Sequence, residues 1–311
     1  MDSFLRAVQV VLPMTMMVGI GVLFRIFHVA DGPTMKKVDN MIFKVFMPML
    51  SFYNIYKTDF SQLETIGYIL YGALGLLILF VASMFLVPRF VKPAPTAAAF
   101  GQAMFRSNYL IFGAAVAESI YGEGNIGFVT LLGAVAVPMY NALAVILLEK
   151  ARNGNASTKK LLLAIAKNPT VVATAIGLAV NFSGLVLPDL VLGVAKDLAG
   201  LTTPLSFLSI GVTLSLGTVG KKGYLVASTL LRLLLIPAVF VTGGALLGFR
   251  GQEMCALLIL FAAPTAVSSY PTAVAMGADG DFAAQMVAYT TICCLPTIFL
   301  WTMLLSHFGI M

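Results

Sequence analysis

The chain has 311 residues, of which 59% are hydrophobic and only 10% charged, and its mean hydropathy is +0.97. A soluble domain carries about 25% charged residues, so this chain has too little charge to cover a surface that faces water. The composition therefore excludes a soluble enzyme and a disordered scaffold, and it predicts an integral membrane protein.

Long apolar segments recur along the whole chain. A helix that crosses a bilayer needs about 20 mostly apolar residues, and on this basis the sequence predicts an all-α polytopic membrane protein with ten transmembrane helices. The longest connection is the polar segment 149–160, so no room is left for a soluble domain. In chain order the ten helices are expected near residues 7–24, 38–56, 65–87, 97–120, 126–148, 166–185, 190–216, 224–248, 254–277 and 283–307.

The positive charges outside these helices fall mostly on one side of the membrane. The other side holds only Arg6, Lys57 and Arg250. Because cytoplasmic loops carry the excess of Lys and Arg, we expect a cell-membrane protein with both termini on the extracytoplasmic side. The basic balance is thus a signal of topology, and no nucleic-acid partner is expected. The cationic side holds Arg25, Lys36, Lys37, Arg89, Lys92, Lys150, Arg152, Lys159, Lys160, Lys167, Lys221 and Lys222.

The two halves of the chain resemble each other at a constant spacing of 156 residues. The pattern predicts two five-helix repeats, 1–148 and 166–311, joined by a cytoplasmic linker over 149–165. Because five is odd, the second repeat enters the membrane from the opposite side, and inverted repeats of this kind are typical of secondary transporters. The pairs at this spacing are Pro13 with Pro169, Gly21 with Gly177, Pro48 with Pro204, and Phe105 with Phe261.

Polar residues and helix breakers interrupt the fourth and ninth predicted helices at repeat-equivalent positions. In the fourth, Arg106 stands at a depth where a charge is costly, and Asn108 and Gly113 are weak helix formers. In the ninth, Pro264 and Pro271 each remove a backbone donor. Paired interruptions predict a transport site, where free helix N-termini suit an anion. The candidate binding residues are Arg106, Ser107, Asn108, Tyr140, Asn141, Thr265, Ser268, Ser269 and Tyr270, and the candidate helix breaks are Gly113, Pro264 and Pro271.

Several of these positions also have a plain structural interpretation. A proline in a transmembrane helix is often only a kink, and Tyr140 and Asn141 suit helix packing as readily as a cavity. Arg232 could pair with an acid or with backbone carbonyls and serve the structure alone. The sequence leaves these alternatives open, together with the question whether Arg106 contacts the substrate.

A set of short motifs gives the chain a family resemblance. In this combination and order the chain resembles the auxin efflux carrier family over essentially its whole length. The resemblance implies a fold like that of the sodium/bile-acid symporters, in which the first, second, sixth and seventh helices form a scaffold. The other six form a mobile transport domain, with the broken fourth and ninth helices crossing at its centre. The motifs are VFMPMLSFYNIY at 45–56, RSNYLIFG at 106–113, VPMYNALAVILLE at 137–149, KNP at 167–169, TTPLSFLSIGVTL at 202–214 and AAPTAVSSYP at 262–271.

The resemblance also assigns roles to single residues. Asn108 matches the family's crossover asparagine, Tyr140 a pocket tyrosine, and Pro264 or Pro271 the crossover proline. Where the family commonly has a proline a few residues after the position of Gly113, this chain has two alanines, at 114 and 115. The resemblance therefore implies a fourth helix that is bent less sharply and held open only by Asn108 and Gly113.

Residues and resemblance together predict a secondary transporter of a small organic anion, most simply a carboxylate, that works by elevator-type alternating access. The alternatives are a sodium-coupled symporter of the same fold and a membrane sensor that binds without transport. An enzyme is not expected, because His28 and His307 lie outside the helix cores, and no cofactor or metal is expected. The expected partners are the organic anion and the lipid bilayer, and a homodimer is left open.

Acidic residues are missing from the sequence near the predicted crossing. The ninth helix has no Asp or Glu between Met254 and Gly277, which disfavours a sodium site. Glu118 is the nearest acid to Asn108, about 15 Å along a helix at 1.5 Å per residue. We therefore expect a uniporter, or a carrier whose substrate itself bears the proton, and an inside-negative potential favours anion export by about 2.3 kcal/mol per charge per 100 mV.

Overall fold

The computed structural model describes residues 2–58, 66–122, 125–154, 158–214 and 221–311. Within these ranges the chain is helical, and its extended backbone pairs only at one isolated bridge, between Ser107 and Thr265. Five of the described helices are long and apolar enough to cross a membrane, and a sixth crossing results if the bent pair Leu161–Lys167 and Pro169–Phe182 is taken as one. The protein is an all-helical polytopic membrane protein.

A helix or a series of consecutive helices overlaps each of the ten predicted ranges. The predicted linker 149–165 is largely helical, because α8 extends into it as far as Asn153 and α9 begins within it at Thr158; residues 155–157 lie outside the described part. The helices are α1 (Asp2–Ile26), α2 (Gly32–Met41), the π-helix η1 (Ile42–Phe46), α3 (Met47–Tyr56), α4 (Gly67–Phe85), α5 (Val87–Phe90), α6 (Ala94–Phe105), α7 (Tyr109–Tyr121), α8 (Gly127–Asn153), α9 (Thr158–Lys167), α10 (Pro169–Phe182), α11 (Asp189–Thr213), α12 (Lys222–Leu230), the π-helix η3 (Leu231–Leu235), α13 (Ile236–Leu246), α14 (Gly251–Ala262), α15 (Ser269–Ala275) and α16 (Gly280–His307).

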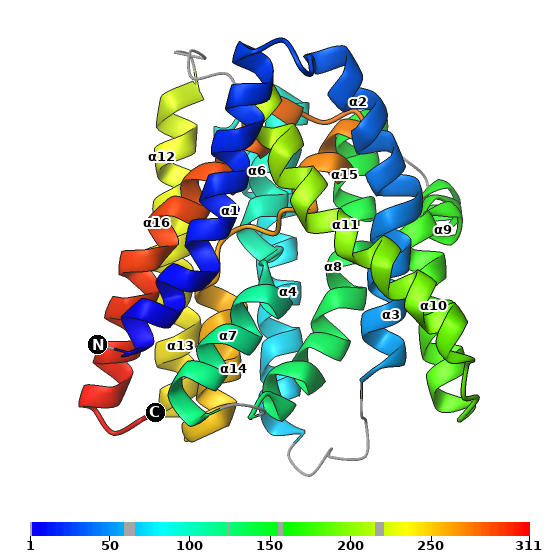
Figure 1. Ribbon diagram of the computed structural model, residues 1–311. Coiled ribbons are helices and arrows are strands. Elements are labelled where there is room, and N and C mark those ends of the chain that lie inside the picture. Colours follow the sequence, from blue (N-terminus) through cyan, green and yellow to red (C-terminus); the bar gives the residue numbers. More distant parts are fainter. Residues whose placement is uncertain (1, 59–65, 123–124, 155–157, 215–220) are drawn as a thin grey trace.

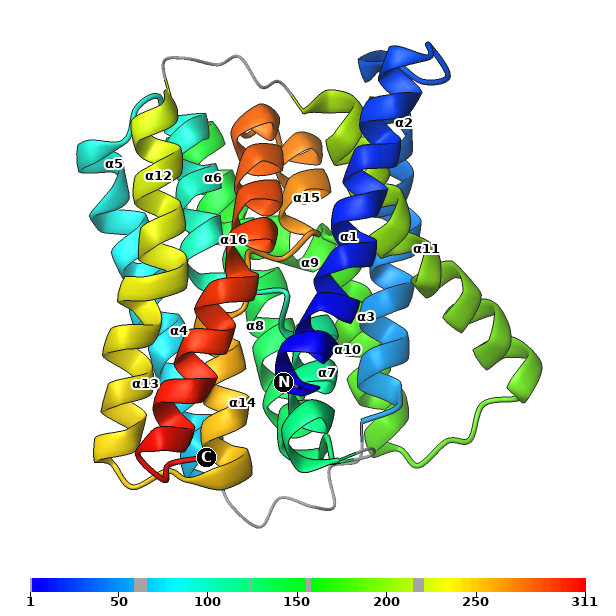
Figure 2. The ribbon, with the colours of Figure 1, turned by 60° about the vertical axis from the view of Figure 1, so that its left-hand side comes forward.

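The helices pack in two groups that meet along one seam. In what we call the first bundle, α11 packs along α1, α2, η1 and α3, and α10 packs against α3. The second bundle contains α4 to α8 and α12 to α16, in which α4 packs on α6 and α8, and α14 packs on α7 and α13. Figure 2 shows the first bundle on the right and most of the second on the left, with α7 and α8 between them. Both chain termini lie at the same end of the molecule, which we call the termini side (Figures 1 and 2).

Glycines allow the closest helix contacts of the first bundle. A Cβ atom on Gly21 of α1 would lie 2.2 Å from the Leu208 carbonyl oxygen of α11, and one on Gly211 would lie 2.1 Å from the Val18 carbonyl oxygen of α1. The repeat partner of Gly21, Gly177 of α10, faces the Phe52 carbonyl of α3 at 3.1 Å. Small residues of this kind let membrane helices approach closely, and the paired glycines make their contacts in opposite halves of the chain.

Two helix breaks lie against each other at the centre of the molecule. α6 ends at Phe105 and α7 begins at Tyr109, while α14 ends at Ala262 and α15 begins at Ser269. Between them, the Asn108 amide donates to the Pro264 carbonyl at 2.8 Å, and the Ala266 amide donates to the Arg106 carbonyl at 3.0 Å. These two bonds form the isolated bridge. Each interrupted helix thus supplies the backbone partners that the other one lacks.

Two of the three predicted helix breaks lie elsewhere than expected. Gly113 is inside α7, where a Cβ atom would lie 2.5 Å from a methyl group of Val129 of α8. Its role is therefore close packing, and the break precedes it at 106–108. Pro271 is in the first turn of α15, where a missing amide costs no helix bond. Of the three, Pro264 alone lies in a break.

The outer face of the second bundle is apolar. On α4 the residues Leu70, Leu74, Leu77 and Val81 are all exposed, and their spacing of three or four residues places them on one face of the helix. An apolar face of this length on the outside of the molecule fits contact with lipid.

Candidate functional site

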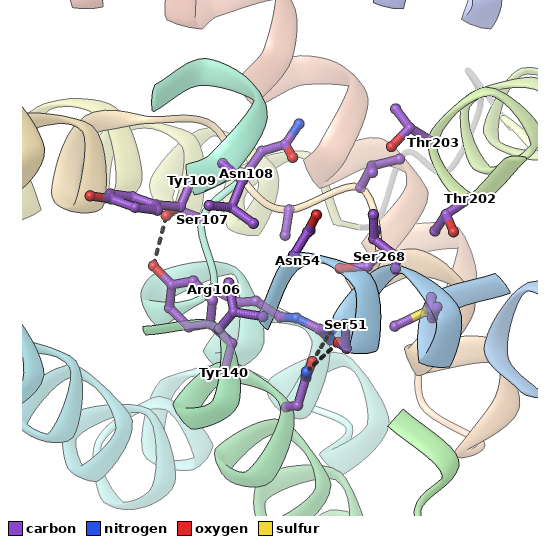
Figure 3. Close-up of a pocket in the computed structure, with 17 residues that line it drawn as sticks. Ser51, Asn54, Arg106, Ser107, Asn108, Tyr109, Tyr140, Thr202, Thr203 and Ser268 are labelled. Atoms are coloured by element: carbon purple, nitrogen blue, oxygen red, sulfur yellow. Dashed lines mark hydrogen bonds between the residues drawn. The ribbon is translucent and has the colours of Figure 1, made fainter. Parts of the chain in front are cut away.

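A cavity of about 130 Å³ lies beside the two helix breaks, where the second bundle meets the first. Cavities for drug-sized ligands measure about 300–1,000 Å³, so this one fits a smaller molecule. Its wall comes from the break after α6, the start of α7, α8, and the residues before α15, and on the facing side from α3 and α11. Polar side chains line much of it, and Figure 3 labels Ser51, Asn54, Arg106, Ser107, Asn108, Tyr140, Thr202, Thr203 and Ser268 among them.

Arg106 places a buried positive charge in the wall of this cavity. Its side chain is 3% exposed and donates to Gln102 Oε1 at 2.7 Å, to Thr272 Oγ1 at 3.1 Å and to Asn141 Oδ1 at 3.2 Å. All three acceptors are neutral. No described carboxylate forms an ion pair with the guanidinium. Its positive charge is therefore not offset by an acid, in a medium of low dielectric constant where charges interact strongly.

A second buried arginine, Arg232 of η3, holds the ends of both interrupted helices. Its guanidinium is fully buried and donates to the Met104 carbonyl of α6 at 2.9 Å, to the Leu260 carbonyl of α14 at 3.1 Å and to the carbonyl of Ala263, directly after α14, at 2.9 Å. The last carbonyls of a helix have no partner within the helix and carry a partial negative charge. Of the alternatives that the sequence leaves open for Arg232, the structure selects backbone carbonyls.

Donors without partners border the cavity. The Asn108 side-chain amide nitrogen and the Thr202 hydroxyl are both buried, and neither has a hydrogen-bond partner in the structure. Asn108 stands directly before α7, and the first two residues of that helix, Tyr109 and Leu110, also line the cavity. A helix N-terminus carries a partial positive charge and unpaired amides. The wall therefore offers hydrogen-bond donors to a ligand.

Further hydrogen bonds order the wall. The Ser107 and Tyr140 hydroxyls lie 2.8 Å apart, as Figure 3 shows. Asn141 accepts from Arg106 and donates from its amide nitrogen to Ser51 Oγ at 3.0 Å. Because Ser51 belongs to α3 and Asn141 to α8, this bond crosses the seam between the two bundles.

A second cavity, of about 310 Å³, continues from the first. Both are lined by Asn54, Leu110 and Val137, and the second also reaches Lys57 and Thr58, just beyond the end of α3. This end of α3 points to the termini side (Figure 1). The second cavity therefore adjoins the site and lies toward the termini side.

The match to a family model covers residues 7–302, almost the whole chain, and the model describes a membrane transport protein. The chain belongs to this family, which includes the auxin efflux carriers. No curated protein matches the chain. A family of membrane transporters is not enzymatic.

Six of the nine predicted binding residues line the cavity of this transporter, and three do not. Thr265, Ser269 and Tyr270 lie outside its wall. The Thr265 amide donates to Thr290 Oγ1 of α16 at 3.1 Å, which braces the second helix break. Tyr270 points to α2 and α11. The six that line it are Arg106, Ser107, Asn108, Tyr140, Asn141 and Ser268.

The first bundle contributes polar residues that the sequence analysis missed. These are Ser51 and Asn54 of α3, and Thr202 and Thr203 of α11. They flank Pro48 and Pro204, which the repeat analysis had already paired. Polar residues beside a proline that recurs in both repeats could have indicated a second part of the binding site. Nothing local in the sequence, however, indicates that they face the fourth helix.

One acid from a distant part of the sequence contacts the helix that follows the second break. Asp39 of α2 accepts a hydrogen bond of 2.9 Å from the Tyr270 hydroxyl, in the helix that follows the second break. Asp39 is 225 positions before Pro264 and is brought there only by the packing of α2 against α15. Glu118, the nearest acid in sequence, is in the last turn of α7.

Proposed function

We propose that this membrane transporter carries a small organic anion, most simply a carboxylate, which binds where the two helix breaks cross. The observation that carries this proposal is the pair of buried arginines, Arg106 and Arg232. Neither has a carboxylate among the hydrogen bonds and ion pairs that the structure describes. Two buried positive charges without a described acidic partner favour an anionic ligand.

The donors of the wall suit the same ligand. One oxygen of a bound carboxylate can accept from the unpartnered Asn108 amide nitrogen, beside the positive end of α7. Another can accept from the Thr202 hydroxyl or from Arg106, which line the same cavity. Hydrogen bonds to a charged group are the stronger kind. The free donors therefore favour an anion over a neutral sugar or a cation.

Transport by elevator-type alternating access is the mechanism we infer for this site. In this proposal ten membrane crossings form two inverted repeats, the first bundle is the scaffold, and the second bundle moves across it. The position of the cavity on the seam between the bundles supports it, as do the repeat-related glycine contacts in opposite halves. Inverted repeats supply two related states that open to opposite sides. By the distribution of positive charge, the termini side is extracytoplasmic.

Ligand binding by purified protein tests the substrate class. The full-length chain in detergent is titrated calorimetrically with mono- and dicarboxylates of increasing length, and with amines and sugars of matched size. We expect binding of carboxylates only, weakened about tenfold or more, or about 1.4 kcal/mol, by Asn108→Ala and by Arg106→Gln. Asn40→Ala, at an exposed position of α2, is the matched control. Binding of amines or sugars alone would contradict the proposal.

Flux measurements separate a carrier from a sensor and from a sodium symporter. Proteoliposomes are loaded with a radiolabelled carboxylate that binds, and potassium with valinomycin sets the membrane potential. A carrier moves the anion down its gradient without sodium and faster when the potential drives negative charge in the same direction. Binding without flux would identify a sensor, and an absolute requirement for sodium would identify a symporter.

A further inference from the structure

One buried carboxylate joins the two bundles on the side opposite the termini. Asp39 of α2 is 1% exposed and Tyr270 of α15 is 2% exposed, and the Tyr270 hydroxyl donates to Asp39 Oδ2 at 2.9 Å. The same hydroxyl lies 3.0 Å from Thr213 Oγ1 and 3.3 Å from Ser209 Oγ, both on α11. The tyrosine of the second bundle is thus inserted between two helices of the first.

Asp39 has no charged partner to offset its burial. Its second oxygen, Oδ1, is buried and has no hydrogen-bond partner, and the carboxylate forms no ion pair with any residue that the structure describes. The elements packed against α2 are η1, α11 and α15. On α15 the titratable residue is Tyr270 itself. The lysines of η1 and α2, which are Lys44, Lys36 and Lys37, are exposed. The charged residues of α11 are Asp189, Lys196 and Asp197, which lie at least about 18 Å along the helix from Ser209 at 1.5 Å per residue.

This environment favours the neutral acid as long as the bundles are in contact. A buried carboxylate that faces only the Tyr270 and Ser209 hydroxyls lacks most of the hydration that it has in water, and burial penalises the charged form. If the bundles separate at this point, water reaches Asp39 and the charged form gains its hydration. Closure therefore takes up a proton, and opening releases one.

The proton exchanges with the side opposite the termini. Asp39 is not among the residues that line either cavity, and the second cavity extends from the first toward the termini side. In Figures 1 and 2, α2 and α15 lie in the opposite half of the molecule. A proton that binds when this side closes consequently returns to the same side when it opens, and no proton crosses the membrane.

We propose that Asp39 is a proton-binding site between the two bundles, and that its protonation holds the transporter closed on the side opposite the termini. This inference rests on the alternating-access mechanism proposed above. It adds a ligand, the proton, which sets the balance between the two states without being transported. Acidification of the side opposite the termini is expected to favour the state seen here, and a rise in pH to favour opening.

Cysteine labelling measures this opening directly and needs no substrate. Met35 is buried one helical turn before Asp39, on the same face of α2, and Lys37 is exposed on the same helix. Met35→Cys and Lys37→Cys are made separately in the full-length chain in detergent and labelled with a maleimide. The quantity compared is the labelling rate of the Met35→Cys variant divided by that of the Lys37→Cys variant, after labelling of the native cysteines has been subtracted. Taking this ratio cancels the intrinsic pH dependence of the thiol reaction.

The ratio is expected to rise by about tenfold or more between about pH 5 and pH 8, because one pH unit of difference in proton affinity between the two states changes their balance tenfold. With Asp39→Asn, a neutral residue of the same shape, the ratio should stay low and independent of pH. Asp31→Asn removes an exposed acid at the start of the same helix and should leave the profile unchanged. A flat profile in the otherwise native chain, or a pH dependence that survives Asp39→Asn, would overturn the inference.

A second variant keeps the test decisive if Asp39→Asn does not fold. Tyr270→Phe removes the hydrogen bond from the Tyr270 hydroxyl to the carboxylate, so the charged form becomes still less favourable in the closed state. The rise in labelling should then extend to higher pH, and a profile identical to that of the native tyrosine would contradict the proposal. Carboxylate binding is measured on the same preparations. If carboxylates do not bind but the pH profile of labelling is as expected, the proposed function alone is wrong. If carboxylates bind but the pH profile is flat, this inference alone is wrong.

Discussion

The main-chain amide of Asn108 donates a hydrogen bond of 2.8 Å to the carbonyl oxygen of Pro264. The bond joins two helix breaks that are 156 positions apart, and it fixes the backbone from which Arg106 and Asn108 reach the cavity. A side chain of α16 supports the same junction, because Thr290 Oγ1 accepts from the Thr265 amide at 3.1 Å. The geometry of the site therefore depends on residues outside its wall.

Thr290→Val should weaken both the fold and ligand binding. The substitution keeps the shape of the side chain but leaves the buried Thr265 amide without an acceptor, which costs about 1–3 kcal/mol. Thr291→Val is the matched control, because the Thr291 hydroxyl bonds only to Val287 of its own helix. Thermal unfolding and carboxylate titration of both variants check this. Equal losses of stability and of binding in the two variants would show that the hydrogen bond to the Thr265 amide contributes no more than the bond that Thr291 makes within its own helix.

Arg232→Lys should be strongly destabilising although it keeps the charge. Lysine has a single ammonium group in place of the planar guanidinium. It cannot donate to all three carbonyls that accept hydrogen bonds from Arg232 at the ends of α6 and α14. Leaving buried acceptors unpaired costs about 1–3 kcal/mol each, so we expect a loss of several kcal/mol. Arg250→Lys, which alters an exposed arginine bonded to the Ala245 and Phe249 carbonyls, should change the melting temperature little. Comparable melting temperatures for the two variants would contradict this role of Arg232.

Gly211→Ala should separate α1 from α11. The added methyl group would lie 2.1 Å from the Val18 carbonyl oxygen, so the helices must move apart and lose packing where α1 meets α11. Gly200→Ala is the control on the same helix, because a Cβ atom there meets nothing within 4 Å. It should be neutral or stabilising by up to about 1 kcal/mol, the usual gain of alanine over glycine in a helix. Thermal unfolding in detergent compares the two.

Asp279→Ala should lower stability at neutral pH and much less in acid. Burial favours a raised pKa for Asp279, but hydrogen bonds from Lys221, Thr96 and the Phe282 amide outweigh it and hold the pKa below its ordinary value. A carboxylate whose pKa is lowered by folding stabilises the fold above the pKa of the unfolded state, and this contribution disappears as the pH falls through the lowered pKa. Including the lost N-cap of α16, the cost at pH 7 should be about 1–2 kcal/mol. A difference between native and variant melting temperatures that stays constant down to pH 3 would contradict this assignment.

Glu118→Gln should leave transport unchanged in rate and in its response to the membrane potential. Glu118 is in the last turn of α7 and does not line the cavity beside the crossing, so it has no part in neutralising the substrate. The measurement is carboxylate flux in proteoliposomes with imposed pH and potassium gradients, and Asn108→Ala serves as the variant that should lose transport. If Glu118→Gln loses pH-driven flux but keeps substrate exchange, Glu118 couples transport to protons. The expectation of transport without proton coupling through the protein would then be wrong.

The sequence alone determined the class of protein, the helical segments and the two interruptions. These properties are local, because the length of an apolar run and the position of a proline or asparagine act within one helix. The sequence also identified six of the residues that line the cavity, since polar groups in an apolar segment are costly enough to indicate a function. It misplaced Gly113, because a glycine that allows close packing cannot be distinguished locally from one that breaks a helix.

Only the tertiary structure decided which polar groups meet. Arg232 turns to backbone carbonyls, Ser51 and Thr202 face the crossing from another bundle, and Tyr270 leaves the cavity to reach Asp39. Each of these contacts joins residues far apart in the chain, and the sequence around either partner is equally compatible with lipid, water or protein as its neighbour. What selects the partner is the packing of whole helices, which brings together polar groups from distant segments and leaves most of them hydrogen-bonded.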